Sequence, residues 1–160
     1  MAGSIYSFLT LIGVMSISDD GKGSITGVFL PNSNLPCMRE HESDIISEAI
    51  AQINEYFNGS RKEFDIPLNI DAKGFRRNVL DTLTEIPYGE LRTYAQIAES
   101  AGSPKAYRAV GTACSENPIP IIIPCHRVVP SSGGIGNYSG GSSMKKKLIE
   151  HERNSRDFVI

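Results

Sequence analysis

Apolar and polar residues alternate along the first third of the chain as they do in β-strands. Residues 6–17 and 24–30 are rich in β-branched and aromatic side chains, and Asp19-Asp20-Gly21-Lys22-Gly23 lies between them with turn-forming residues. This pattern predicts an antiparallel hairpin. Apolar residues then recur at helical spacing from residue 46 to 57, after Ser43, a favourable N-cap residue. The first third therefore predicts a small antiparallel sheet packed against one helix.

Helical spacing dominates the next part of the chain. It predicts a helix over residues 75–85. Thr93 and Gln96 have the spacing of a capping box that begins a second helix, which Gly102 would end. A third helix is expected over 103–114, with a serine as its cap and a proline in its first position. Two short helices joined by a tight turn with glycine predict a helix-turn-helix.

The last part of the chain is organised around an apolar run between prolines. Ile121-Ile122-Ile123 is short and uncharged, which predicts a buried strand or another extended segment. A loop rich in Gly and Ser follows, and a final helix is expected from Ser142 to about Arg153. Because residues 67–74 are polar and interrupted like a linker, two domains are expected, 1–71 and 72–160.

Composition narrows the class of protein. The chain has 160 residues, 40% of them hydrophobic and 21% charged, which is typical of a globular protein. No apolar run approaches the ~20 residues of a membrane helix, and the N-terminus has no basic segment of the kind that precedes a signal sequence. Three cysteines, an odd number, argue against a disulfide framework and favour a reducing compartment such as the cytoplasm.

Charge is divided unevenly between the two halves. Residues 1–71 hold 4 Lys and Arg against 10 Asp and Glu, a net charge of −6, whereas residues 72–160 hold 12 against 8, a net charge of +4. This asymmetry predicts that the second half alone meets phosphate groups. Chance asymmetry between two surfaces is the alternative.

The main candidate for chemistry is Cys125, between Pro124 and the dipeptide His126-Arg127. Nearby positive charge favours a thiolate, so a lowered thiol pKa and a reactive cysteine are expected. The alternative is an inert buried cysteine beside two surface residues. Neighbours in an extended segment point to opposite faces, so a proton passing from Cys125 to His126 would need a bridging water or a local turn.

Two further patterns in the sequence are candidate ligand sites. Cys37 and His41 could form half of a zinc site, but no second half follows at suitable spacing, so no metal is expected. The loop over residues 131–141 lets backbone approach a ligand closely, but it lacks the Lys-Ser or Lys-Thr pair of a phosphate-binding P-loop.

Taken together, these motifs resemble those of the O6-alkylguanine–DNA alkyltransferases. The resemblance covers most of the second half of the chain, in order and at compatible spacing. It implies an α+β fold, with a ribonuclease H-like N-terminal sheet and helix that buttress a mainly helical, winged-helix-like C-terminal domain. The matching segments are Tyr88-Gly89-Glu90, Thr93-Tyr94, Ala109-Val110-Gly111, Asn117-Pro118, Pro124-Cys125-His126-Arg127-Val128, Gly136-Asn137-Tyr138-Ser139-Gly140-Gly141 and Leu148-Ile149-Glu150-His151-Glu152.

The resemblance implies a single irreversible displacement without a cofactor. Cys125 would take an alkyl group from guanine O6 in DNA, and the thioether formed has no good leaving group, so the protein acts once. The implied catalytic residues are Cys125, His126 and Glu152 in a relay through water, Tyr94 as a donor to the base, and Asn117 as a support of the cysteine segment. The implied substrate-binding residues are Tyr138, Ser139, Gly140, Val128 and Lys145.

The implied partner is double-stranded DNA with O6-alkylguanine, with O4-alkylthymine left open, bound by a monomer in the cytoplasm or in a eukaryotic nucleus. The nucleotide must be flipped out for its base to react. Arg108 would fill the gap, and its helix would lie in the minor groove. Its small residues would equally suit close packing on another helix, and Lys145, Lys146 and Lys147 serve either phosphate contact or solubility. The implied DNA-binding residues are Thr93, Tyr94, Ala106, Arg108, Ala109 and Gly111.

Two other functions remain open on sequence alone. A related binding module would recognise alkylated bases without transfer, although such modules lack the cysteine that this chain keeps. A hydrolase or acyltransferase with a Cys125-His126-Glu152 triad would turn over repeatedly and would have no need of a helix-turn-helix.

Overall fold

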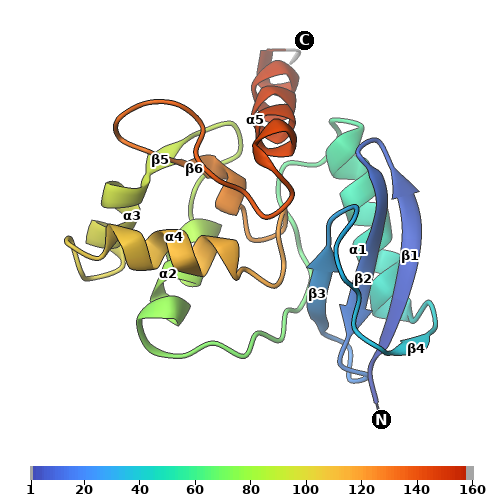
Figure 1. Ribbon diagram of the computed structural model, residues 1–160. Helices are drawn as coiled ribbons and strands as arrows, with labels where there is room; N and C mark the ends of the chain where they lie inside the picture. Colours follow the sequence, from blue (N-terminus) through green and yellow to red (C-terminus); the bar gives the residue numbers. More distant parts are fainter. Residues whose placement is uncertain (1, 158–160) are drawn as a thin grey trace. The chain divides into compact units, whose positions relative to one another are not determined.

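The computed structural model describes residues 2–157 of the chain, with side chains described as far as residue 154. The chain divides into two units, Met1–Ile70 and Asp71–Ile160, which are drawn in Figure 1. Among the described residues, none of the helices combines the length and the apolar character needed to cross a membrane.

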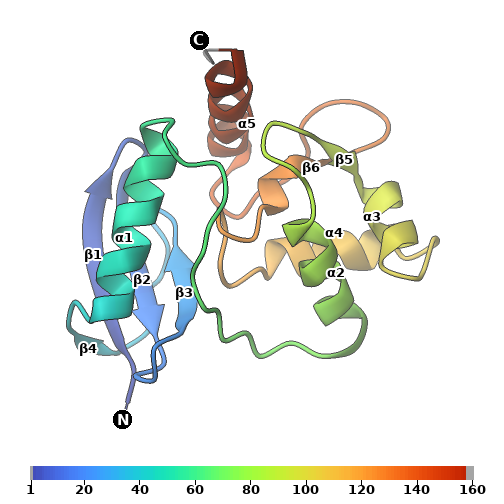
Figure 2. The same cartoon turned by 180° about the vertical axis from the view of Figure 1, so that it is seen from behind.

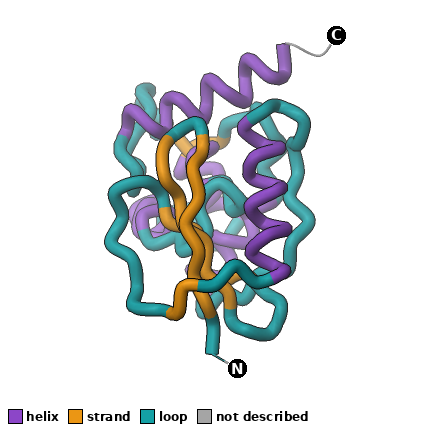
Figure 3. The backbone as a smooth tube through the Cα atoms, turned by 90° about the vertical axis from the view of Figure 1, so that its right-hand side faces the viewer, coloured by secondary structure: helices purple, strands orange, loops and turns teal. Residues whose placement is uncertain are grey.

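The first unit is a four-stranded sheet with one helix against it. The strand order is β3-β2-β1-β4, in which β1, β2 and β3 are antiparallel and the short β4 runs parallel to β1. Figure 2 shows α1 lying along the sheet, and Figure 3 shows the β1–β2 hairpin from the side. The elements are β1 (Ser4–Thr10), β2 (Gly13–Asp19), β3 (Ile25–Phe29), β4 (Arg39–Glu40) and α1 (Asp44–Phe57).

The hairpin predicted between β2 and β3 is confirmed, but residues 6–17 are two strands and not one. The chain turns at Leu11-Ile12, where Thr10 Oγ1 donates to Gly13 O at 2.7 Å and accepts from Ile12 N at 3.2 Å. Gly13 has a φ of 120°, which glycine adopts without steric cost. Because the turn consists of apolar residues, the hydrophobic pattern did not reveal it.

A buried carboxylate connects the strands of the first unit to its helix. Asp19 accepts hydrogen bonds from Ser4 N at 2.7 Å and from Ser43 Oγ at 2.6 Å. Ser43 is also the N-cap of α1, as predicted, since its side chain accepts from Ile46 N. The same carboxylate therefore links β1, β2 and the start of α1.

The second unit is mainly helical, as predicted. Its helices α2, α3 and α4 pack against one another (Figure 1), and a two-residue parallel pair, β5 with β6, joins Arg92 to Val128 and Thr93 to Val129. This pairing holds the start of α3 beside the segment that follows Cys125. The elements are α2 (Gly74–Thr84), β5 (Arg92–Thr93), α3 (Tyr94–Ser100), α4 (Tyr107–Ser115), the 3₁₀ turn η1 (Cys125–Arg127), β6 (Val128–Val129) and α5 (Ser142–Asp157).

The helix-turn-helix has one confirmed boundary and one corrected boundary. The capping box of α3 is present, because Thr93 Oγ1 accepts from Gln96 N and Thr93 N donates to Gln96 Oε1. The next helix begins at Tyr107, three residues after the proline that was expected in its first position. Residues 103–106 form a turn instead, in which Ala106 N donates to Ser103 O at 2.9 Å. Proline is favoured in the second position of such a turn as well as in the first turn of a helix, so the Ser-Pro pattern fits both.

The apolar run before Cys125 is buried as predicted, but it is not extended. Ile123 N donates to Ile119 O at 2.9 Å, which closes a tight turn. At its centre Ile121 has a φ of 74°, a strained conformation for a β-branched residue. The hydrophobic pattern therefore predicted burial correctly and the backbone incorrectly.

Candidate active site

Cys125 is the first residue of η1 and lies in the wall of a cavity of about 760 Å³. Its side chain is 2% exposed, so the cavity reaches it at a buried end. The other walls come from the start of α3, from one side of α4 and from the loop before α5. The lining residues are Tyr94, Ala95, Tyr107, Arg108, Gly111, Thr112, Cys114, Ser115, Pro130, Ser131, Ser132, Gly136, Asn137, Tyr138 and Ser139.

Asn117 holds the tight turn that precedes Cys125. Its Nδ2 donates to Ile123 O at 2.9 Å, and its Oδ1 accepts from Ile119 N at 3.0 Å. Both bonds are buried, so their loss would leave backbone groups without partners. A further hydrogen bond from Asn117 favours the thiolate of Cys125.

The pKa of the Cys125 thiol is raised and not lowered. Burial raises it most, while the Asn117 hydrogen bond and the charge of Lys145 lower it by less. The expected lowering by His126 and Arg127 is therefore wrong. Both of these side chains bond to Glu152 instead, and the cation that acts on Cys125 is Lys145.

Glu152 is the centre of a buried hydrogen-bond network. His126 Nε2 donates to Glu152 Oε2 at 2.5 Å, and Arg127 Nε donates to Oε1 at 2.8 Å. Gly89 N also donates to Oε1 at 3.1 Å. Arg127 Nη1 donates to Ile86 O at 2.6 Å, which fixes the guanidinium independently of Glu152. The network therefore joins η1, α5 and the turn after α2.

The network fixes the protonation of the imidazole. Burial alone would raise the pKa of Glu152, but the bonds and charges of His126 and Arg127 outweigh it and hold that pKa well below its ordinary range. Burial lowers the pKa of His126, so the ring is neutral at neutral pH. Its Nε2 donates to Glu152, which leaves Nδ1 unprotonated. Nδ1 is buried and has no hydrogen-bond partner among the described residues, so it is the nitrogen that can accept a proton.

Lys145 is fully buried, with 0% of its side chain exposed. Its Nζ donates to Val128 O at 2.6 Å, to Asn137 O at 3.3 Å and to Tyr94 OH at 3.5 Å. Burial, and to a smaller extent the neighbouring Cys114 and Cys125, raise the pKa of Tyr94 to about 12. Tyr94 therefore keeps its proton at neutral pH and can donate it as a hydrogen bond.

One face of α5 explains why Lys145 is buried. Lys145, Leu148, Ile149 and Glu152 are all buried and follow the spacing i, i+3, i+4 and i+7. Lys146 and its neighbour are exposed. Phosphate contact by Lys145 is therefore excluded. The same spacing is visible in the sequence and would have predicted that Lys145 is buried.

The structure brings most of the predicted site residues together, but not all of them. Tyr138 and Ser139 line the cavity, and the buried hydroxyl of Tyr138 has no hydrogen-bond partner among the described residues. Within the described chain, Val128, Gly140 and Lys145 are outside the cavity walls. Val128 is buried, and its carbonyl oxygen accepts from Lys145.

The side chains of α4 divide between two environments, and contact of its small residues with DNA stays a prediction. Val110 and Ala113 are buried against the other helices, whereas Arg108 and Ala109 are exposed. A Cβ built on Gly111 would meet no atom within 4 Å, so space is open beside that glycine. Of the remaining predicted DNA-binding residues, Thr93 caps α3 and Ala106 is half-buried at the start of α4.

Sequence reasoning missed three residues of the site. The sequence indicated Arg127 as a cation for the thiol, but its side chain bonds to Glu152. Cys114 lines the cavity, where burial and the nearby Cys125 raise its thiol pKa to about 12. Tyr107 lines the cavity while half exposed. Cys114 and Tyr107 lie in the same helix as Arg108, and this shared helix was the signal in the sequence that could have revealed them.

Two family descriptions match the chain in succession. The 6-O-methylguanine DNA methyltransferase ribonuclease-like domain matches residues 7–70, and the DNA binding domain of the same name matches residues 74–154.

Similar proteins agree with these matches. The methylated-DNA–protein-cysteine methyltransferase of Methanosarcina barkeri is 48% identical over 108 residues, which cover 68% of each chain. The Mycobacterium bovis protein of that name is 47% identical over 107 residues, 67% of this chain and slightly less than two thirds of its own length, 65%. The protein of that name from Methanosarcina mazei is 39% identical over 142 residues, 87% of this chain and 90% of its own.

Solved structures are similar as well. The crystal structure of Mycobacterium tuberculosis OGT in complex with DNA is 36% identical, with a TM-score of 0.89 over 95% of this chain and 94% of that one. The M. tuberculosis O6-methylguanine methyltransferase is 34% identical, with a TM-score of 0.86 over 96% of this chain and 94% of that one. On the matched domains and these relatives, the chain belongs to the O6-methylguanine DNA methyltransferase family.

Proposed function

We propose that this chain repairs O6-alkylguanine in double-stranded DNA by moving the alkyl group onto its own Cys125. The observation that carries the proposal is the position of Cys125 in a cavity wall, next in sequence to the buried His126–Glu152 pair. A bond forms between the sulfur and the alkyl carbon, and the bond from that carbon to guanine O6 breaks. The thioether has no leaving group to return, so each molecule reacts once.

The proton of the thiol leaves through His126. Because burial raises the thiol pKa, Cys125 holds its proton until a substrate is in place. Nδ1 of His126 accepts the proton through a bridging water, and the charged Glu152 stabilises the imidazolium that results. Arg127 keeps Glu152 ionised throughout, so Glu152 orients the imidazole and does not itself become protonated.

Tyr94 donates a hydrogen bond to the departing guanine, on which negative charge develops. With a pKa raised to about 12 it is protonated at neutral pH, and Lys145 Nζ donates to its oxygen, which makes the hydroxyl a stronger donor. Ser139, which also lines the cavity, assists near the oxygen. Tyr138 and the loop backbone enclose the base.

Residues 72–160 bind the DNA, and residues 1–71 support them. The matched DNA binding domain and the DNA complex of the M. tuberculosis relative support this division. The reacting base is flipped into the cavity, Arg108 fills the gap, and the exposed small residues of α4 approach the minor groove. One copy of the chain supplies every residue named here, so a monomer suffices. A chemistry that needs a free thiol fits a reducing compartment, the cytoplasm or a eukaryotic nucleus.

Mass spectrometry tests the proposal directly. After incubation with a duplex that contains O6-methylguanine, the peptide with Cys125 should gain the mass of one methyl group, with one equivalent repaired per protein. Binding without a mass change would identify a recognition module instead. Repair that continues beyond one equivalent would identify a hydrolase.

A further inference from the structure

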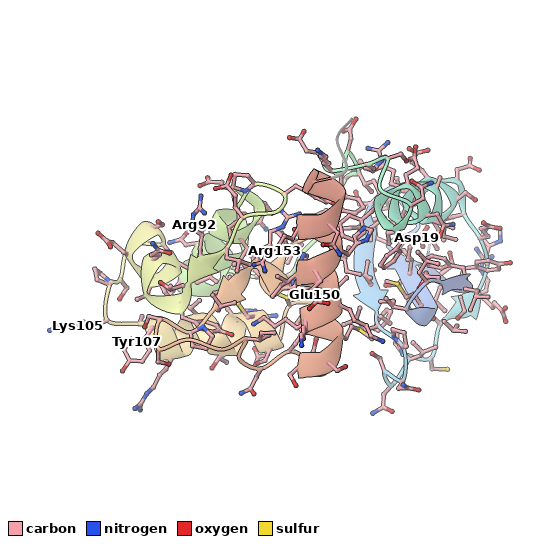
Figure 4. All side chains as sticks on the ribbon, turned by 90° about the horizontal axis from the view of Figure 1, so that it is seen from above. Asp19, Arg92, Lys105, Tyr107, Glu150 and Arg153 are labelled. Atoms are coloured by element: carbon pink, nitrogen blue, oxygen red, sulfur yellow. The ribbon has the colours of Figure 1, made fainter. Side chains whose placement is uncertain are left out.

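Tyr107 is the first residue of α4 and lines the cavity next to Arg108, with 50% of its surface exposed. Figure 4 labels it together with Lys105 at this end of the helix. Cys114, seven residues further along the same helix, also lines the cavity and is less exposed. At about 1.5 Å per residue, Tyr107 lies about 10 Å along the helix axis from Cys114. The ring therefore belongs to the outer end of the cavity.

The surroundings of the ring suit a flat ligand. Gly111, one turn after Tyr107 on the same side of α4, also lines the cavity and carries no side chain. A Cβ built on Gly111 would meet no atom within 4 Å, so the space beside it is open. An aromatic ring beside open space can accept another ring on its face.

We infer that Tyr107 stacks on the base that lies next to the gap left by the flipped nucleotide. This inference rests on the proposed function. An alkyl carbon at Cys125 places the flipped base at the inner end of the cavity, so the base that reaches Tyr107 is a different one. Arg108 and Tyr107 point about 100° apart around the helix, which lets one enter the gap while the other covers the exposed face of the neighbouring base. Stacking is tolerant of sequence because every base presents a π-face.

Two variants test the role of the ring. Tyr107→Ala should slow repair of a duplex with O6-methylguanine about tenfold, in line with the loss of one base–aromatic stack. Tyr107→Phe should keep the wild-type rate, because the face of the ring and not its hydroxyl makes the contact. With a free O6-alkylguanine, Tyr107→Ala should lose much less of its rate than it loses on the duplex. An unchanged melting temperature of both variants would show that folding is intact.

Salt dependence separates stacking from phosphate contact. Tyr107→Ala should leave the salt dependence of the duplex rate unchanged, whereas loss of a phosphate contact reduces it. Lys105→Ala is the matched control, since Lys105 is exposed at the same end of α4 and carries a charge. The inference is overturned if Tyr107→Phe is as slow as Tyr107→Ala, if Tyr107→Ala reduces the salt dependence, or if it repairs duplex at the wild-type rate. A wild-type chain that gains no methyl group would instead refute the proposed function itself.

Discussion

Arg127 and Glu152, 25 residues apart in the chain, form an ion pair of 2.8 Å between side chains that are 7% and 2% exposed. Removal of one member of such a pair leaves the other charged and buried without compensation. The pair holds the carboxylate in position for His126, which bonds to its other oxygen. The stability of the second unit and the protonation of His126 therefore depend on the same carboxylate.

Replacement of Glu152 should damage both properties. Glu152→Gln should lower the free energy of unfolding by about 3–5 kcal/mol, because Arg127 stays charged and buried. Alkyl transfer should also slow, since His126 loses its charged partner. Urea unfolding and single-turnover repair measure the two effects. Glu150→Gln, an exposed position on α5 that Figure 4 labels, is the control. Equal stability of the two variants would contradict the buried pair.

Stability should fall as the solution is acidified below neutral pH. The folded pKa of His126 is below its ordinary value of 6.5, so the stability that its neutral form contributes is present above 6.5 and is lost as the pH falls through it. The folded pKa of Glu152 is below its ordinary 4.5, so its contribution is lost only as the pH falls below 4.5. Urea midpoints measured against pH should decline in this order. Glu152→Gln should show a smaller decline below 4.5, and the part that remains comes from other carboxylates such as Asp19, whose pKa is also lowered.

Lys145 should control the ionisation of Cys125. Its charge lowers the pKa of the thiol, so Lys145→Met should raise that pKa and shift the alkylation of Cys125 by iodoacetamide to higher pH. The variant should also be less stable by about 1–3 kcal/mol, because the carbonyl of Val128 loses a buried partner. Lys146→Met, exposed on the same helix, should match the wild type. An unshifted profile for Lys145→Met would exclude Lys145 as the relevant cation.

Arg108 should matter for duplex DNA and not for the chemistry. Its side chain is exposed, so Arg108→Ala should change stability by less than about 0.5 kcal/mol. Repair of a duplex should slow strongly, because nothing fills the gap in the stack, while reaction with a free alkylated guanine should proceed at the wild-type rate. Parallel single-turnover rates on both substrates measure this difference. Equal losses on the two substrates would remove the role in base flipping.

The two cysteines of the cavity should differ in function. Burial and the nearby Cys125 raise the pKa of Cys114 to about 12, and Cys114, unlike Cys125, is not followed in the sequence by a histidine that could take its proton. Cys114→Ser should therefore retain transfer of one methyl group per protein, whereas Cys125→Ser should lose it. Peptide mass spectrometry after reaction with methylated DNA locates the methyl group. A methyl group on Cys114 in the wild-type chain would contradict this assignment.

Local sequence signals predicted the parts of the fold that local chemistry decides. The cap at Ser43 and the capping box of Thr93 with Gln96 appear as expected, because each satisfies backbone N–H groups within one turn of helix. Sequence patterns that are compatible with two local structures led to wrong predictions of the backbone. The apolar run around Ile121 and the Ser-Pro pair at 103–104 both form turns, since packing selects among conformations that the local pattern leaves open.

The sequence by itself determined which groups carry the chemistry: a thiol at Cys125, an imidazole at His126 and a carboxylate at Glu152, in motifs that match a known family. Only the tertiary structure decided how these groups ionise. Arg127 is two residues from Cys125 but bonds to Glu152, while Lys145, twenty residues away, lowers the pKa of the thiol. Burial raises the pKa of the Cys125 thiol by more than Lys145 lowers it. The pKa of a group depends on how deeply the group is buried and on its distance through space from other charges. Neither quantity can be read from positions in the sequence.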